Sequence, residues 1–180
     1  EASDFPEELQ NLFNNPERNS NPWGLGAHTR ADWAEGLDLK VGEPAEYLFF
    51  VGCAGSFDDR NKKVSRATAK LLKEAGVDFS ILGEMETCNG DPARRAGNEF
   101  LFQMMAEMNV DNLNSLGTLK IITACPHCFH TIGKEYEKYG GKYEVYHHSQ
   151  VLNKLRQEEK LKIRDFEDKV TFHDPCYLGR

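Results

Sequence analysis

The sequence lacks a run of about 20 consecutive apolar residues, which is the length that a membrane-spanning helix requires. Its first residues, Glu1 to Asp4, also lack the basic and apolar regions of a secretory signal peptide. No run of Lys and Arg lies beside aromatic residues, and 22 basic against 29 acidic residues leave a net charge of -7, which argues against nucleic acid as the main partner. We therefore expect a soluble, cytoplasmic chain whose partner is a protein or a small molecule.

Cysteine is scarce, and the five cysteines present are an odd number without a secretory signal. This usage fits metal or redox chemistry better than a structural disulfide framework. At 180 residues the chain can hold one domain of roughly 100 to 150 residues and an appendage. Residues 1–45, which are rich in Asn, Glu and Pro, are expected to form a linker or N-terminal extension.

From Tyr47 onward, short apolar runs alternate with amphipathic segments of helical period. Strands are expected at 47–51, 77–82, 119–124 and 143–146, and helices at 64–75, 91–108, 126–139 and from 149 onward, with Asp91 and Ser149 as N-caps and a turn or short helix at 109–117. This alternation is typical of an open, parallel, Rossmann-like sheet with helices on both faces. We therefore predict one α/β domain over residues 46–168.

The end of the chain resembles the start of that domain. Residues 170–180 again read as a strand that ends in a cysteine, Cys176, and a small-residue turn, as in residues 47–55. Residues 169–180 are therefore predicted to be the first strand and turn of a truncated second copy, with Cys176 as that copy's first cysteine.

Four cysteines are expected to converge on one site. Cys53, Cys88 and Cys125 each follow a predicted parallel strand, and Cys128 lies one helical turn after Cys125. In open α/β sheets the carboxyl ends of the strands meet at the crevice where ligands bind. Helix N-termini after Cys88 and Cys125 favour thiolates there, because the positive end of the helix dipole lowers a thiol pKa.

The residues alone leave several chemistries open for these thiols. Four thiolates can hold an iron-sulfur cluster or close a tetrahedral zinc site, although structural zinc ligands usually come as two close pairs and only Cys125 and Cys128 are close in sequence. Cys125-Pro126-His127-Cys128 is also the context of a thiol-disulfide oxidoreductase, which would leave Cys53 and Cys88 unexplained. Buried, inert thiols are the remaining alternative.

Residues 46–180 resemble the cysteine-rich domain of heterodisulfide reductase catalytic subunits, glycolate oxidase iron-sulfur subunits and membrane-bound iron-sulfur oxidoreductases. The resemblance is carried by Cys53, the string from Cys88-Asn89-Gly90 to Arg95, Cys125-Pro126-His127-Cys128, and Cys176. It implies an iron-sulfur cluster on Cys53, Cys88, Cys125 and Cys128. The implied cluster is [4Fe-4S], cubane or non-cubane. Asn89 replaces the second cysteine of the family's Cys-Cys-Gly element, so a bridging thiolate of the non-cubane form is missing, while the four remaining thiolates are enough for an ordinary [4Fe-4S] cluster.

The same resemblance implies an electron-transfer subunit of a larger oxidoreductase. The Cys88-Asn89-Gly90-Asp91-Pro92 variant is most similar to the membrane-bound members, which implies a flavoprotein-type donor, ferredoxin-like redox partners and a quinone acceptor at the cytoplasmic face of the membrane. Disulfide reduction is the alternative. No catalytic residue is assigned, and the side chains expected near the cluster without binding it are Asn89, His127, His148 and Arg94, although an ion pair with Asp91 or Glu99 also explains Arg94.

Overall fold

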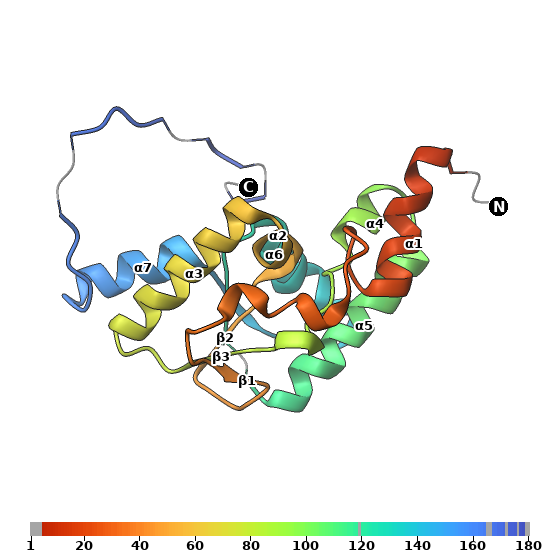
Figure 1. Cartoon of the computed structure of the whole chain (residues 1–180). Coiled ribbons are helices and arrows are strands. Elements are labelled where there is room, and N and C mark those ends of the chain that lie inside the picture. The colour runs from red at the N-terminus through yellow and green to blue at the C-terminus, as the bar shows by residue number, and fades with distance from the viewer. Residues whose placement is uncertain (1–4, 119, 165–166, 172, 176, 179–180) are drawn as a thin grey trace.

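The sheet is parallel throughout and has five strands. The computed structural model describes residues 5–118, 120–164, 167–171, 173–175 and 177–178. The strands are β1 (Lys40–Val41), β2 (Tyr47–Phe49), β3 (Phe79–Ile81), β4 (Lys120–Thr123) and β5 (Glu144–His147). Their order across the sheet is β1-β3-β2-β4-β5 (Figure 1). The predicted open α/β fold is therefore confirmed.

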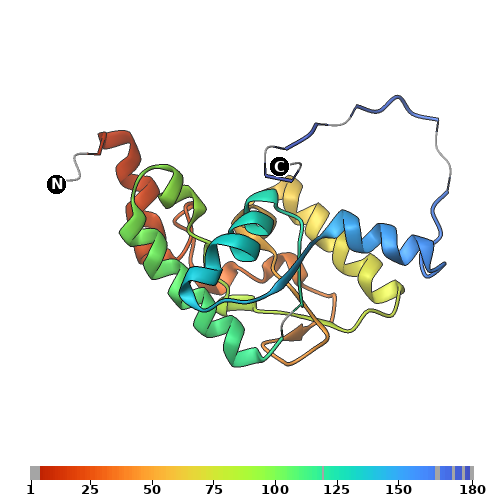
Figure 2. The same ribbon diagram turned by 180° about the vertical axis from the view of Figure 1, so that it is seen from behind.

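Helices cover both faces of this sheet. They are α1 (Gln10–Asn19), α2 (Gly52–Phe57), α3 (Asp59–Glu74), α4 (Asp91–Arg95), α5 (Glu99–Leu116), α6 (Pro126–His130) and α7 (His148–Gln157). Single turns of 3-10 helix lie at Glu7–Leu9, Ala27–Thr29, Asp32–Ala34 and Gly83–Met85, and α6 continues as a π turn at Thr131–Glu135 and a 3-10 turn at Tyr136–Tyr139. Helices α3 and α7 lie on one side, and α5 with α1 and α4 lies on the other (Figures 1 and 2). Within the described ranges, no helix has both the length and the apolar character required to traverse a bilayer.

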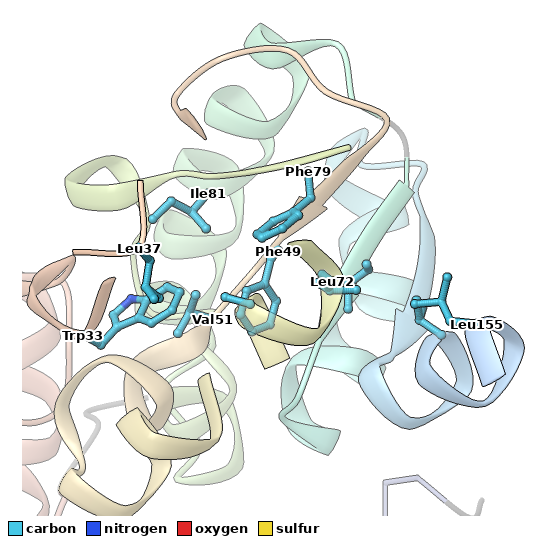
Figure 3. Close-up of a cluster of buried hydrophobic side chains, with 11 residues drawn as sticks. Trp33, Leu37, Phe49, Val51, Leu72, Phe79, Ile81 and Leu155 are labelled. Carbon is cyan, nitrogen blue, oxygen red and sulfur yellow. The ribbon is translucent and has the colours of Figure 1, made fainter. Parts of the chain in front are cut away.

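The central strand explains how two cores form on opposite faces. Side chains alternate along a strand, so Leu48 and Phe50 pack with α5, whereas Phe49 and Val51 pack with α3 and α7. Trp33, which comes from the N-terminal extension, completes the second of these cores beside Phe49 (Figure 3). Because β2 is covered on both sides, its continuous apolar sequence is the one expected for a buried parallel strand.

Residues 5–45 lie against the domain along much of their length. β1 pairs in parallel with β3 through Lys40 and Ser80, and thereby adds an edge strand that the sequence pattern did not indicate. Phe13 of α1 packs in a third buried cluster with Ala93, Leu101 and Cys88. The extension therefore contributes to the core, while the predicted domain boundaries at 46 and 168 stay predictions.

Two predicted helix caps are wrong. Asp91 is the first residue of α4, and Gly90 is the N-cap, with a φ of +82° that glycine adopts at little cost. The N-cap of α7 is His147, not Ser149; the His147 backbone N–H donates to Gln150 Oε1 at 2.9 Å. Ser149 Oγ lies 2.7 Å from His147 Nδ1, so Ser149 contacts the N-cap residue but is not the N-cap itself.

The helix predicted over 91–108 is two helices, and the connection predicted at 109–117 is part of the second. The chain breaks after α4 at Gly97, whose φ is +90°, and α5 restarts with Asn98, whose side chain accepts from the Leu101 N–H at 3.0 Å. This break changes the phase of the helical face. As a result Phe100 is 78 % exposed, and Met104 and Met108 are also exposed.

The helix predicted at 64–75 is present and ends as expected, because the Gly76 N–H donates to the Lys73 carbonyl and Gly76 has a φ of +68°. Its buried face includes Ser65 and Thr68, whereas the apolar side chains of Val64 and Leu71 are exposed. At the end of the chain, the described residues within 169–180 form no strand. Cys176 lies outside the described residues.

Candidate cysteine site

The four predicted cysteines come together at the carboxyl ends of the central strands. Cys53 lies in the first turn of α2 after β2, and Cys88 follows β3 and its 3-10 turn. Cys125 is the N-cap of α6 after β4, and Cys128 lies inside α6. The described cysteines are all free thiols.

These thiols line one cavity of about 200 Å³. Its other lining residues are Pro22, Trp23, Ala54, Asn89, Pro92 and His127. Pro22 and Trp23 come from the N-terminal extension, so the cavity wall is built from both parts of the chain. In the described ranges no group of three His, Cys, Asp or Glu side chains is placed to hold a single metal ion, and we therefore describe the site as a thiol-lined cavity.

Cys53 and Cys88 form one thiol pair. A hydrogen bond between the two thiols lowers the pKa of Cys53, although burial opposes the change. Arg30 adds to the lowering, since its Nη2 donates to the Cys53 sulfur at 3.4 Å. The same hydrogen bond, together with burial, raises the pKa of Cys88 well above its ordinary value.

Cys125 and Cys128 form the second pair. The Cys128 thiol donates to Cys125, and with the backbone N–H groups of Cys128 and His127 this lowers the pKa of Cys125 to about 6. Those N–H groups belong to the first turn of α6, so the lowering of a thiol pKa predicted at that helix N-terminus holds for Cys125. The same prediction is wrong for Cys88, because its hydrogen bond with Cys53 and its burial raise its pKa. The pKa of Cys128 is raised, first by its hydrogen bond to Cys125 and then by burial.

Asn89 faces this cavity and contacts a cysteine. Its Nδ2 donates to the Cys128 sulfur at 3.3 Å, while its Oδ1 accepts from the Asp91 N–H at 3.0 Å. The backbone of Asn89 is also fixed by a hydrogen bond, because the hydroxyl of buried Tyr136 donates to the Asn89 carbonyl at 3.0 Å. The amide is thus fixed against a thiol at the position where the resemblance leads one to expect a further cysteine.

His127 also lines the cavity, and Arg94 and His148 do not. His127 Nδ1 lies 2.7 Å from Asp91 Oδ2, and the His127 ring is half exposed. Arg94 pairs instead with Glu99 at 3.2 Å and with Glu135 at 2.9 Å, so the ion-pair explanation with Glu99 holds. His148 lies at the start of α7, where its ring contacts that of His147 with centroids 4.5 Å apart.

Sequence reasoning missed two buried charged residues at this site, Arg30 and Glu86. Glu86 is 3 % exposed and accepts from the N–H groups of Val51 and Gly52, both at 2.9 Å, where β2 passes into α2. Arg30 is 2 % exposed and donates to Glu86 at 3.0 Å. No motif marks either residue, and the only signal is that Glu86 lies two positions before Cys88.

Taken together, the fold and the site define a class: an open parallel α/β domain that gathers free thiols at the carboxyl ends of its strands. Comparison with known proteins specifies the family. Residues 47–133 match the family described as CCG, cysteine-rich domain. The chain therefore contains a cysteine-rich domain of this family, as the sequence resemblance indicated.

Curated relatives extend the match beyond those residues. The chain is 46% identical over 98% of its length to EtfAB:quinone oxidoreductase of Syntrophomonas wolfei, and 42% identical over 96% of its length to the probable iron-sulfur-binding oxidoreductase FadF of Bacillus subtilis. It is 31% identical over 89% of its length to a chain of the dihydromethanophenazine:CoB--CoM heterodisulfide reductase of Methanosarcina acetivorans. The chain spans 26% of each of the first two relatives and 40% of the third. No solved structure gives a significant match.

Proposed function

We propose that this chain is the iron-sulfur electron-transfer domain of a larger oxidoreductase, with Cys53, Cys88, Cys125 and Cys128 as the ligands of a [4Fe-4S] cluster. The observation that supports this most directly is that four free thiols from three separate segments line one cavity of about 200 Å³. Thiolates are the protein ligands of such clusters. The donor set therefore fits the group, and the bound cluster would supply one-electron redox chemistry.

The residues around the thiols suit that role. Cys53 and Cys125 have lowered thiol pKa values, so two of the four ligands are already biased toward the thiolate form. The Arg30 and Asn89 nitrogens donate to the sulfurs of Cys53 and Cys128. Such donors offset negative charge on cluster-bound thiolates and influence the reduction potential.

For the whole protein, we infer electron transfer from a soluble flavoprotein-type donor to a quinone, with ferredoxin-like domains or subunits as intermediate partners at the cytoplasmic face of a membrane. This is supported by the 46% identity to a protein named EtfAB:quinone oxidoreductase. The weaker identity of 31% to a chain of a heterodisulfide reductase makes disulfide reduction the alternative.

A thiol-disulfide oxidoreductase using Cys125 and Cys128 is the second candidate. It is favoured by the pKa of about 6 at Cys125 beside a cysteine of raised pKa, which is the arrangement of reactive Cys-X-X-Cys pairs. In that chemistry the two thiols would form one disulfide and release two electrons and two protons to a disulfide substrate. It assigns no role to Cys53 and Cys88.

The test is iron and acid-labile sulfide analysis of anaerobically prepared protein, with Cys125→Ser and Cys128→Ser as variants. We expect brown wild-type protein and loss of at least half of the iron in each variant, because each removes one of four thiolates. Full iron content in both variants would contradict the four-cysteine assignment. Colourless wild-type protein that cycles between dithiol and disulfide would favour the second candidate, and bound zinc would favour a structural metal site.

A further inference from the structure

Arg30 lies ahead of the residues that match the cysteine-rich family, yet its side chain reaches the sulfur of Cys53, one of the cavity-lining thiols. It follows the 3-10 turn Ala27–Thr29 in the N-terminal extension and is 2 % exposed. Its Nη2 lies 3.4 Å from the Cys53 sulfur and 3.0 Å from Glu86 Oε1. Its guanidinium carbon also lies 5.5 Å from the centre of the Phe57 ring. The extension therefore places a cation beside one proposed cluster ligand.

The contacts of Glu86 show that neutralising this carboxylate is only part of what Arg30 does. Both Glu86 oxygens already accept backbone N–H groups, from Gly52 and Val51. An arginine that serves a carboxylate alone usually presents two nitrogens to its two oxygens. Here a single nitrogen contacts both Glu86 and Cys53, and among the described residues Arg30 Nε has no hydrogen-bond partner. The guanidinium is thus turned toward the sulfur.

A buried guanidinium keeps its charge, because arginine is not deprotonated in proteins and water screens a buried charge only weakly. The net charge at the cavity then depends on three groups: Arg30, Glu86 and the thiolates. Reduction of a bound cluster adds one electron and one negative charge. A fixed positive charge hydrogen-bonded to a ligand sulfur stabilises that reduced state more than the oxidised state.

We propose that Arg30 is a positioning residue that raises the reduction potential of the cluster by holding a permanent positive charge against the Cys53 sulfur. This inference rests on the proposed function. It also assigns a role to the N-terminal extension, because residues 47–133 by themselves do not contain the charge that faces Cys53. The electron enters from the donor and leaves to the acceptor, and Arg30 exchanges no proton.

The first experiment compares wild type and Arg30→Gln, both prepared anaerobically, by iron and sulfide content and by a spectroscopically monitored redox titration. Glutamine keeps a donor near the site and removes the charge. We expect iron content to be retained and the equilibrium constant for reduction to fall threefold to tenfold, which is a decrease in midpoint potential of about 30 to 60 mV for one electron. Unchanged potential with full iron would overturn the role of Arg30 and leave the proposed function standing.

The matched control is Arg66→Gln. Arg66 Nη1 donates to the carbonyls of Trp33 at 2.5 Å and Glu35 at 2.9 Å, so it holds the same extension without a described contact to a thiol. This variant removes the same charge from the chain and loosens the same segment. Its potential should equal that of wild type. A decrease as large as that of Arg30→Gln would show that docking of the extension, not the Arg30 charge, sets the potential.

Glu86→Gln and the double variant Arg30→Gln/Glu86→Gln separate the two contacts of Arg30. If Arg30 acts only by neutralising Glu86, the double variant has the same potential as Glu86→Gln. We expect the equilibrium constant for reduction of the double variant to be at least threefold lower than that of Glu86→Gln. If Arg30→Gln binds no iron, Arg30→Lys provides the readout: the retained charge should keep its potential near that of wild type, and a decrease of 30 mV or more would overturn the proposal. Absence of iron from wild type would contradict the proposed function itself.

Discussion

Asn89 is the residue at which this site differs from the Cys-Cys-Gly pattern of its family. Its amide contacts the Cys128 sulfur at 3.3 Å and is buried. Asn89→Cys would place a fifth thiol at this cavity. We expect the absorption and electron paramagnetic resonance spectra of the bound cluster to change in this variant, because an added thiolate changes the ligand set of the iron.

Asn89→Ser is the control for that substitution, since serine has the size of cysteine but supplies no thiol. Both variants lose the amide contact with Cys128, so a change shared by both reports the lost hydrogen bond. Only a change specific to Asn89→Cys reports a new ligand. Identical spectra for wild type and Asn89→Cys would show that position 89 does not reach the cluster.

His148 gives the protein a pH-dependent stability away from the thiols. Burial and the neighbouring His147 lower the pKa of His148 to about 4, whereas its ordinary value is 6.5. Between these pH values the unfolded chain binds more protons than the folded chain. The contribution of His148 to the free energy of unfolding is therefore complete above pH 6.5 and decreases as the pH drops toward 4. Because the side chain is partly exposed, we expect a loss of about 1 to 2 kcal/mol.

Urea unfolding of wild type and His148→Phe at several pH values between 7 and 4 tests this expectation. Phenylalanine fills a similar volume and cannot be protonated, so the loss of stability on acidification should be smaller in the variant. His28→Gln, at an exposed position, serves as the control and should follow wild type. Equal pH dependence of wild type and His148→Phe would refute the assignment to His148.

Among the secondary-structure elements, the junction between β2 and α2 packs closely against a thiol of the site. Gly52 has a φ of +76°, and a Cβ added there would lie 3.1 Å from the Cys128 sulfur. Gly76, at the end of α3, has a similar φ of +68° but nothing within 4 Å of an added Cβ. The two glycines therefore share a backbone requirement and differ in their contact with a thiol.

This pair supports a matched substitution experiment. Gly52→Ala and Gly76→Ala should each destabilise the fold by about 1 to 2 kcal/mol, the cost of a left-handed conformation in a residue with a Cβ. Only Gly52→Ala should also lower the iron content, because its methyl group crowds Cys128. Thermal unfolding and iron analysis of both variants measure the two effects. Equal iron content in both would show that the junction tolerates a methyl group.

In the molecule as a whole, Tyr177 lies far from the cysteines in sequence but contacts His127, which lines the cavity. The Tyr177 ring lies 4.7 Å from that of His127 and 4.9 Å from that of His130, measured between centroids. The chain also spans only about a quarter of the Syntrophomonas and Bacillus relatives. Whether Cys176 belongs to this site or to a second copy of the domain can be tested by substitution.

We expect Cys176→Ser to leave the iron content of the first site unchanged, because the repeat argument assigns this cysteine to a second domain. Cys88→Ser is the matched comparison, since it replaces a cysteine that lines the cavity and should lower the iron content. Iron analysis of the two variants decides the matter. A comparable loss in Cys176→Ser would make Cys176 a ligand of the first site and the substitute for the cysteine missing at position 89.

The α/β fold, and the meeting of Cys53, Cys88 and Cys125 at one edge of the sheet, could be predicted from the amino-acid sequence. Both follow from local rules: apolar runs alternating with helical patterns indicate a parallel sheet, and the ends of parallel strands lie at one edge. The spacing of Cys125 and Cys128 within one helical turn is likewise a local property. Their function as cluster ligands stays a prediction.

The identity of the charged side chains that lie near those thiols became visible in the three-dimensional structure and could not be predicted from the sequence. Arg30 and Glu86 are 56 positions apart, and no periodicity relates them to each other or to Cys53. Arg94 and His148 were expected near the cluster from their positions in the sequence, but they do not line the cavity. Arg94 forms ion pairs with Glu99 and Glu135, and the His148 ring packs against that of His147. Long-range pairing depends on how the extension docks on the sheet, and a local pattern contains no information about that docking.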